Sequence, residues 1–257
     1  MNTNLHTHTF RCGHASGTER EYIETAISGG IKVMGFSEHI PFAFPDGSES
    51  GYRMKIKDVP DYFETLTKLK NEYKEKIDIK IGFEMEYYPI YFDKMLANAK
   101  SWGAEYLILG QHFIGNEHPG GTYSGGDHPS SDQLTEYVDC VVEAIKSGVF
   151  TYVAHPDLFD YSADDHVYIS QMRRICQASK EHGVPLEINF LGIRGKRNYP
   201  KELFWTIAGE VGSPVVYGYD AHSAVDAYDP SSLIYAEKLV KENNLQLIHQ
   251  PTICVLK

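Results

Sequence analysis

The chain has 257 residues, of which 42% are hydrophobic, and its formal net charge is -11. This length fits a single α/β barrel, since such barrels commonly form one unit of about 250 residues, and we expect one domain over residues 1–257. The acidic balance disfavours a general binder of nucleic acids or anionic membranes, because such proteins carry basic patches.

Short apolar or β-branched runs alternate with longer helical patterns along the whole chain. Strands are predicted at residues 4–8, 33–37, 79–83, 106–110, 151–154, 185–189 and 215–219, with a further short one at 245–249. Helices are predicted at residues 18–28, 59–74, 90–101, 131–146, 167–182, 201–209 and 231–243. This alternation is typical of βα units around a parallel sheet, and it predicts a barrel of seven or eight such units.

Two local signals refine this pattern. Thr18 followed by Glu21 forms a capping box at the start of the first helix. The loops at residues 41–58 and 115–130 are long for a compact domain, and the second is rich in glycine, proline and histidine. Long loops of this kind are usually functional or mobile.

The spacing of the cysteines and the length of the apolar runs indicate the cellular compartment of the protein. The four cysteines, Cys12, Cys140, Cys176 and Cys254, form no CxxC pair, so neither a zinc ribbon nor a redox motif is indicated. No apolar run approaches the roughly 20 residues of a membrane span, and the residues before His14 leave no room for a signal peptide. We therefore expect a cytoplasmic protein without membrane attachment, and the sequence indicates no obligate protein partner.

Metal-binding residue types recur where the predicted strands end. His6 and His8 share one face of the first strand, because strand side chains alternate. The other residues of this kind near strand ends are His14, His39, Glu84, His112, His155, Asp220 and His222. A single buried histidine is more often an ordinary core residue, but six of the seven predicted strands end in His, Glu or Asp.

These side chains point to a metal site. The carboxyl ends of all strands in a parallel barrel lie at one mouth, where the active sites of such enzymes are found. Imidazoles with a few carboxylates suit Zn, Mn or Fe better than Mg or Ca, which prefer oxygen ligands. Nine ligands are too many for one ion and are enough for three.

With these residues placed, the chain resembles the polymerase-and-histidinol-phosphatase (PHP) family, and within it the histidinol-phosphatase branch. The motifs that carry the resemblance follow one another in order over nearly the entire chain: HTHT (6–9), SEHIPF (37–42), GFE (82–84), GQHF (110–113), AHPD (154–157), LEIN (186–189) and DAH (220–222). The resemblance implies a distorted (β/α)7 TIM-like barrel with three divalent metal ions (Zn, Mn or Fe) at the C-terminal ends of the strands.

The resemblance also implies how the ligands divide among the ions. One metal would be held by His6, His8, Glu84 and Asp220. A second would be held by Glu84, His112 and His155, so that Glu84 bridges the two. A third would take His14, His39 and His222. Glu86 shares a strand face with Glu84, but the glycine two residues earlier favours Glu84. Gln111 departs from the small apolar residue often expected there, which bears on fine substrate preference and not on metal binding.

A mechanism follows as a hypothesis. Two metals that share a carboxylate can hold a bridging hydroxide at neutral pH, because coordination lowers the pKa of bound water. We predict that this hydroxide attacks phosphorus in line with the departing alcohol, while the third metal spreads the developing charge. Glu84, Asp220 and His222 are the predicted catalytic residues. Either Asp220 or His222 could protonate the leaving alkoxide.

The substrate residues are predicted from their place beside these motifs. Arginine binds phosphate in bidentate fashion, which makes Arg194 and Arg197, in the loop after the sixth strand, the phosphate candidates. Phe42 and Phe113 follow ligand motifs and could wall a pocket for an imidazole ring. Glu117 or Asp160 could pair with an amino group.

The predicted function is hydrolysis of a small-molecule phosphate monoester, namely L-histidinol phosphate to L-histidinol and phosphate in histidine biosynthesis. The identity of this substrate rests on the resemblance. Two alternatives stay open: a phosphoesterase acting on nucleotides or oligonucleotides, and a metal-binding barrel without catalysis. The acidic charge counts against the first alternative, and the presence of all nine ligands counts against the second.

Overall fold

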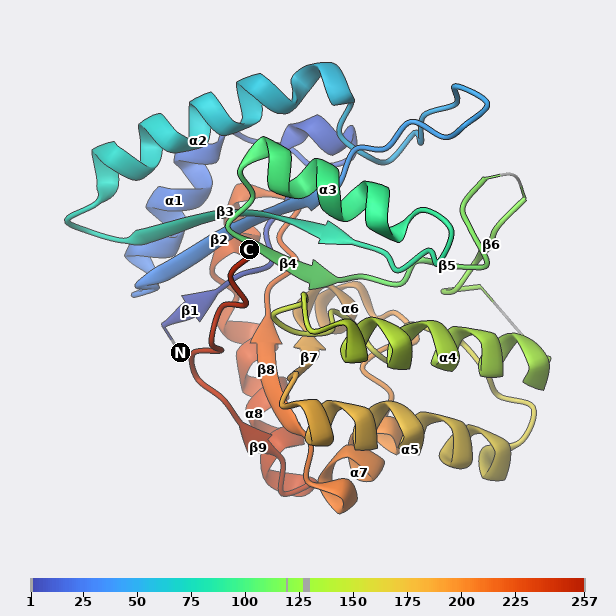
Figure 1. Cartoon of the computed structure of the whole chain (residues 1–257). Helices are drawn as coiled ribbons and strands as arrows, with labels where there is room; N and C mark the ends of the chain where they lie inside the picture. The colour runs from blue at the N-terminus through green and yellow to red at the C-terminus, as the bar shows by residue number, and fades with distance from the viewer. Residues whose placement is uncertain (1, 119, 127–129, 257) are drawn as a thin grey trace.

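A computed structural model of the chain describes residues 2–118, 120–126 and 130–256 (Figure 1). The fold is a mixed α/β arrangement in which a curled parallel sheet is covered on its outside by helices. One part of the sheet contains β1 (Thr3–Asn4), β2 (Val33–His39), β3 (Asp78–Met85) and β4 (Tyr106–Leu109), in that order. The other part contains β7 (Leu186–Asn189), β8 (Pro214–Gly218) and β9 (Gln246–Leu247).

Single β-bridges connect the two parts of the sheet. Val153 pairs in parallel with Leu109 on one side and with Leu186 on the other. The predicted strand at 151–154 is thus reduced to one bridged residue between β4 and β7. On the other side of the sheet, Thr7, which follows β1, pairs in parallel with Ala221, which follows β8. The sheet therefore curls far enough to bring the start of the chain beside the segment that follows β8.

The first predicted strand is shorter than expected. It was predicted over residues 4–8, but β1 ends at Asn4. The Asn4 side chain accepts a hydrogen bond from the backbone N–H of His6 at 3.0 Å and donates one to the Thr7 hydroxyl at 3.0 Å. Such local side-chain bonds compete with the regular ladder, and only the bridge at Thr7 continues the pairing.

All seven predicted helices are present, with ends shifted by at most two residues. They are α1 (Glu19–Ser28), α2 (Val59–Tyr73), α3 (Phe92–Trp102), α4 (Ser131–Ser147), α5 (Asp165–His182), α7 (Glu202–Val211) and α8 (Pro230–Glu242). The predicted capping box of Thr18 and Glu21 is confirmed. The short helix α6 (Phe190–Gly195), which directly follows β7, was not predicted.

Smaller elements lie in the connections. They are the 3-10 helices η1 (Phe10–Cys12), η2 (Ile56–Asp58) and η3 (Ala224–Ala227), and the antiparallel pair β5 (Phe113–Ile114) and β6 (Thr122–Tyr123). The long loop predicted at 115–130 carries β6, while its residues 119 and 127–129 lie outside the described part. In the described residues, no helix is both long and apolar enough to cross a membrane.

Two apolar clusters pack on opposite faces of β4, because successive strand residues point to opposite sides. Leu107 and Leu109 belong to the large cluster with the helices, whereas Tyr106 and Ile108 belong to a smaller one. The smaller cluster consists of Leu5, Tyr106, Ile108, Tyr152, Ala154 and Val216. These six buried residues come from both parts of the sheet and fill the space that the curl encloses.

Candidate metal centre

Glu84, at the end of β3, lies at the centre of a dense group of histidines. Its Oε1 is 2.9 Å from Nε2 of His155 and 3.5 Å from Nε2 of His112. Its Oε2 is 3.0 Å from Nδ1 of His39. The side chain is 1% exposed. One buried carboxylate thus faces three imidazoles that come from three different segments of the chain.

The first two histidines of the chain converge on the same carboxylate. The Nε2 atoms of His6 and His8 are 3.2 Å apart, and both lie near Glu84 Oε2, at 3.6 and 3.5 Å. Asp220 approaches from the other part of the sheet, with Oδ1 at 3.6 Å from His6 Nε2 and 3.4 Å from His8 Nε2. The curl of the sheet therefore brings residues from both ends of the chain to one point.

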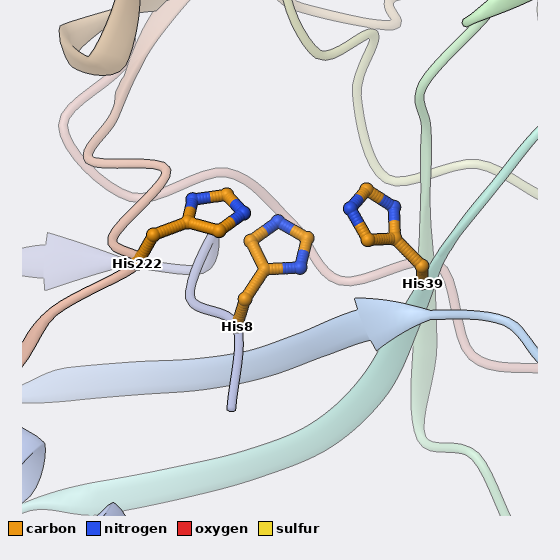
Figure 2. Close-up of side chains that lie close together, drawn as sticks. All are labelled: His8, His39 and His222. Carbon is orange, nitrogen blue, oxygen red and sulfur yellow. The ribbon is translucent and has the colours of Figure 1, made fainter. Parts of the chain in front are cut away.

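A third group of histidines extends from the buried His8 and His39 to the exposed His14. Figure 2 shows His8 between His39, at the end of β2, and His222, in the segment after β8. The ring centroid of His8 is 4.3 Å from that of His39 and 4.2 Å from that of His222. His14 is exposed and lies beside His222, with their Nε2 atoms 3.0 Å apart. All nine predicted ligands therefore lie in one continuous cluster.

The donor atoms are spaced as metal ligands require. Sets of three donor atoms within 4.8 Å of one another are His6–His8–Glu84, His6–His155–Asp220, His39–Glu84–His112, His8–His39–His222 and Cys12–His14–His222. Donors around a tetrahedral ion with bonds of about 2.1 Å lie about 3.4 Å apart. Glu84 Oε2 and Asp220 Oδ1 are buried and have no hydrogen-bond partner among the described residues. The residues therefore fit a polynuclear metal site.

Charge pairing keeps the two carboxylates ionised. Burial alone would raise the pKa of Glu84, but the imidazoles of His112, His6 and His39 outweigh it and hold that pKa well below its usual value. Burial also opposes ionisation of Asp220, yet His6, His222 and His8 lower its pKa well below the ordinary range. Both side chains are anionic at neutral pH, which is the form that binds cations.

Two of these residues have backbone conformations that side chains seldom adopt. The φ angle is 31° at His155 and 45° at Asp220, and such angles in non-glycine residues concentrate at functional sites. Arg194 stabilises the backbone conformation at Asp220, because its guanidinium donates to the carbonyl oxygens of Tyr219 and Asp220 at 2.7 and 2.6 Å. Arg194 thus lies behind the cluster and not in the cavity wall, so Arg197 alone is kept as the phosphate candidate.

The cluster opens into a cavity of about 380 Å³. Its metal-binding side is formed by His14, His39, Glu84, His112, His155, Asp220 and His222. The remaining wall is largely apolar and aromatic: Tyr52, Phe113, Tyr123, Leu158, Leu191, Arg197 and Tyr199. A cavity of this size with convergent polar groups at one side is typical of a small-molecule site. The Arg197 guanidinium is the only arginine in the described lining, and it donates to the Tyr199 hydroxyl at 3.0 Å.

The other predicted substrate residues have different positions. Phe113 lines the cavity as expected, but Phe42 is not among the described lining residues. Phe42 packs instead against Phe44 and Tyr91, with ring centroids 5.2 Å away in both cases, because the chain turns into the apolar core after β2.

Two acidic candidates also lie outside the described cavity lining. Glu117 is buried, and its Oε2 accepts bonds from the Arg53 guanidinium at 2.9 and 2.8 Å and from the Tyr52 hydroxyl at 3.1 Å. Asp160 uses its backbone N–H to bond the Ser124 carbonyl at 3.3 Å. Of the residues that touch Glu117, Tyr52 reaches the cavity wall.

Several residues of the site were not predicted. Tyr199 lies two positions after Arg197, and Cys12 lies two positions before His14, so proximity to a predicted residue could have suggested both. Tyr52 and Tyr123 come from the two long loops, and no pattern in those loops singles them out. Their positions depend on how the loops fold over the cluster.

The fold and the site define a class: parallel α/β proteins with a histidine- and carboxylate-rich cluster, suited to several metal ions, at the carboxyl ends of the strands. Within this class, the model of the PHP domain family matches residues 4–190. The chain belongs to the PHP domain family.

Relatives and solved structures agree with this assignment. The chain is 28% identical to a probable histidinol-phosphatase of Deinococcus radiodurans, over 84% of this chain and 85% of that protein. It is 26% identical to the histidinol-phosphatase of Bacillus subtilis, over 86% of this chain and 93% of that protein. Its fold is similar to that of histidinol phosphate phosphatase from Lactococcus lactis, whose crystal structure contains zinc, L-histidinol and phosphate. The TM-score is 0.76 at 22% identity, and the match covers 100% of this chain and 98% of that one.

Proposed function

We propose that this protein is a metal-dependent phosphomonoesterase that hydrolyses L-histidinol phosphate to L-histidinol and phosphate. The observation that carries the proposal is the nine-residue donor cluster on one side of a cavity that also holds Arg197. A polynuclear cation site beside a guanidinium suits the binding of a phosphate ester. The names of the Deinococcus and Bacillus relatives support the choice of ester.

The proposed metal ligands follow the geometry of the cluster. His6, His8, Glu84 and Asp220 would hold one ion, and Glu84, His112 and His155 a second. His14, His39 and His222 would hold a third, with Cys12 as a further candidate donor beside His14. Ions of Zn, Mn or Fe bound there supply Lewis-acid stabilisation of phosphoryl oxygens and acidify water.

Arg197 and Tyr199 bind and orient the phosphoryl group in this proposal. The Tyr199 hydroxyl accepts from Arg197 Nη1 at 3.0 Å and so fixes the direction of the guanidinium. Tyr199 also packs near His155, with ring centroids 5.8 Å apart. The other guanidinium N–H groups would form charge-assisted bonds to phosphoryl oxygens, where charge develops in the transition state.

In this proposal, Asp220 accepts the proton of the attacking water. Its Oδ2 accepts from the Asn189 amide at 3.0 Å, which aims Oδ1 into the cluster. Asp220 is ionised, because His6 holds its pKa low, and in this proposal the anionic carboxylate accepts that proton. The leaving alkoxide receives its proton from Asp220 or from His222, whose Nδ1 lies 3.2 Å from Asp220 Oδ1.

The organic part of the substrate would occupy the aromatic wall. Phe113 and Tyr123 lie edge to face with ring centroids 5.8 Å apart, and such rings suit an imidazole. Glu117 stays our candidate for the amino group. The bonds from Arg53 and Tyr52 all reach its Oε2, and we propose that Oε1 takes the ammonium.

We also propose that the whole chain forms a single distorted (β/α)7 barrel. The bridges of Val153 and of Thr7 with Ala221 support a distorted (β/α)7 barrel in one domain. The cysteines support a reducing, cytoplasmic setting, because Cys12, Cys140, Cys176 and Cys254 are all free.

The proposal is tested by measuring metal content and phosphate release on one purified sample. The substrates are L-histidinol phosphate, an aryl phosphate and a short single-stranded oligonucleotide. We expect more than one Zn, Mn or Fe ion per chain and a strong preference for L-histidinol phosphate. Indiscriminate release would disprove the substrate, preference for the oligonucleotide would favour the phosphodiester alternative, and metal without any turnover would favour a non-catalytic barrel.

A further inference from the structure

We propose that Glu187, on β7, is a positioning residue for the metal centre: it fixes the ring of His6 and the backbone of His155, and through Asn189 it fixes Asp220. This inference rests on the metal-binding part of the proposed function and not on the identity of the substrate. Glu187 belongs to the LEIN motif, of which the mechanism uses Asn189 alone and the ligand set uses nothing.

The contacts of Glu187 connect it to residues from three segments. Its side chain is 0% exposed. Oε1 lies 2.8 Å from Nδ1 of His6. Oε2 accepts from the backbone N–H of His155 at 3.1 Å and from the Asn189 amide at 2.8 Å. The two oxygens therefore bind donors from the N-terminal segment, from the bridge segment and from the end of β7.

Asn189 extends this network to a fourth segment. Its Oδ1 accepts from the backbone N–H of Gly192 at the start of α6, at 3.0 Å, which fixes the orientation of the amide. The Nδ2 group then points to the two carboxylates, donating to Glu187 Oε2 and to Asp220 Oδ2 at 3.0 Å. The position of Asp220 is thereby linked to Glu187 without direct contact between them.

The contact with His6 decides which nitrogen can bind a metal. A carboxylate only accepts hydrogen bonds, so His6 must carry its proton on Nδ1. In the neutral ring, which is the form that binds a metal, Nε2 then offers its lone pair on the side of Glu84 Oε2 and Asp220 Oδ1, each 3.6 Å away. A carboxylate behind a ligating histidine fixes its tautomer and raises its basicity.

Glu187 is not placed to be a ligand itself. Both of its oxygens are engaged by N–H donors, and among the described residues it belongs to none of the sets of clustered donor atoms. Its space is provided by Gly218 on β8, where an added Cβ would overlap the Glu187 carboxylate. Bulk at Gly218 is therefore incompatible with the present position of the side chain.

Replacement by glutamine tests this role, because the amide has the same shape but cannot satisfy all donors. With its oxygen toward His6, its NH₂ group faces the N–H groups of His155 and Asn189. With its oxygen toward those groups, its NH₂ group faces His6 Nδ1 and drives the His6 proton onto Nε2, the atom that faces the cluster. Both orientations weaken the metal site.

The experiment measures zinc affinity by competition with a chelator at fixed pH for wild type, E187Q and E105Q. Glu105 is the matched control, because it too accepts from a backbone N–H, that of Ile81 at 2.8 Å, but it precedes β4 at the far end from the cluster. We expect E187Q to bind zinc about 10- to 100-fold more weakly and E105Q to match wild type. Wild-type affinity in E187Q, or an equal loss in E105Q, would overturn the proposal.

A measurement on the wild-type protein keeps the proposal testable if E187Q does not fold. Nitrogen-15 NMR of the histidine rings reports which nitrogen carries the proton, and the His6 signal is assigned by its loss in His6→Asn. We expect a proton on Nδ1 of His6 in the zinc-loaded protein, and a proton on Nε2 would contradict the inference. A wild type that binds zinc but does not hydrolyse L-histidinol phosphate would refute the proposed substrate and leave this test intact.

Discussion

Two glutamates in different parts of the sheet occupy matching positions and have different surroundings. Glu84 on β3 is in register with Ile108 on β4, and Glu187 on β7 is in register with Val216 on β8. In each case, a glycine follows two positions after the paired residue: Gly110, just past the end of β4, or Gly218, the last residue of β8. A Cβ at either glycine would overlap the glutamate's carboxylate.

What surrounds each carboxylate determines its role. Glu84 is met by imidazole nitrogens of several histidines and lines the cavity. Glu187 is met by one imidazole and two amide N–H donors and is fully buried. Fixed N–H donors satisfy the carboxylate and remove it from metal binding, whereas imidazoles leave it able to coordinate. The same packing of a glutamate over a glycine thus yields a ligand in one place and a support in the other.

The largest effect is expected from Glu84→Gln, which replaces the central ligand. Loss of a residue that supports a ligand reduces activity by up to about 100-fold. For Glu84→Gln we expect a larger fall in kcat/KM, together with a loss of bound metal. Elemental analysis and phosphate-release kinetics on the same preparation provide the measurement. If Glu84→Gln retained more metal than Glu187→Gln, Glu84 would not be the central ligand and Glu187 would not be only its support.

A comparison of Gly110→Ala with Gly218→Ala comes next. Each added methyl displaces a glutamate without changing its chemistry, so we expect zinc affinity to drop about 10- to 100-fold, with the larger drop at Gly110. Gly51→Ala is the control, because an added Cβ there meets nothing within 4 Å. Competition with a chelator measures all three. Unchanged affinity in Gly218→Ala would show that the site tolerates movement of Glu187.

Arg197→Ala separates phosphate binding from metal binding. A hydrogen bond to a charged group contributes about 1.5–3 kcal/mol, so we expect kcat/KM to fall about 10- to 100-fold with metal content preserved. Lys196→Asn, at an exposed neighbour with φ 49°, serves as control. Steady-state kinetics and elemental analysis decide the outcome. Unchanged kinetics would remove Arg197 from the site.

Counted per pH unit, the smallest effect expected is that of pH on zinc binding. Although burial lowers the pKa of His8, the nearby carboxylates of Asp220 and Glu38 raise it to about 9. A raised pKa means that metal binding must displace a proton at neutral pH, so affinity should increase with pH up to about 9, by about tenfold per unit for each proton released. Proton release on zinc addition in weakly buffered solution measures this. Zinc binding without proton release would contradict it.

The sequence predicts the order of the elements and the clustering of the nine candidate ligands well, because both depend on local patterns. Strand-end histidines and carboxylates are recognisable one by one, and a parallel sheet must bring them to the same edge. The role of Glu187 could not be predicted in this way. Its partner His6 is 181 residues away in sequence, and only the curl of the sheet brings the two together.

The arginines after β7 show the same limit. Arg194 and Arg197 look alike in sequence, yet one bonds backbone carbonyls behind Asp220 and the other faces the cavity. Their separation depends on α6, a helix too short to leave a periodic pattern. Phe42 was misplaced for a related reason, because its neighbours Phe44 and Tyr91 are supplied by loop packing.

The cap of α6 affects how variants of Asp220 should be read. Asn189 joins the start of α6 to the Asp220 carboxylate, and Arg194, near the end of α6, bonds the Asp220 carbonyl. Both ends of the short helix are thus linked to Asp220, and Arg197 lies two residues after the end of the helix. Asp220 consequently helps to position both the proposed metal ligands and Arg197. A substitution of Asp220 will therefore disturb cation binding and phosphate binding at the same time.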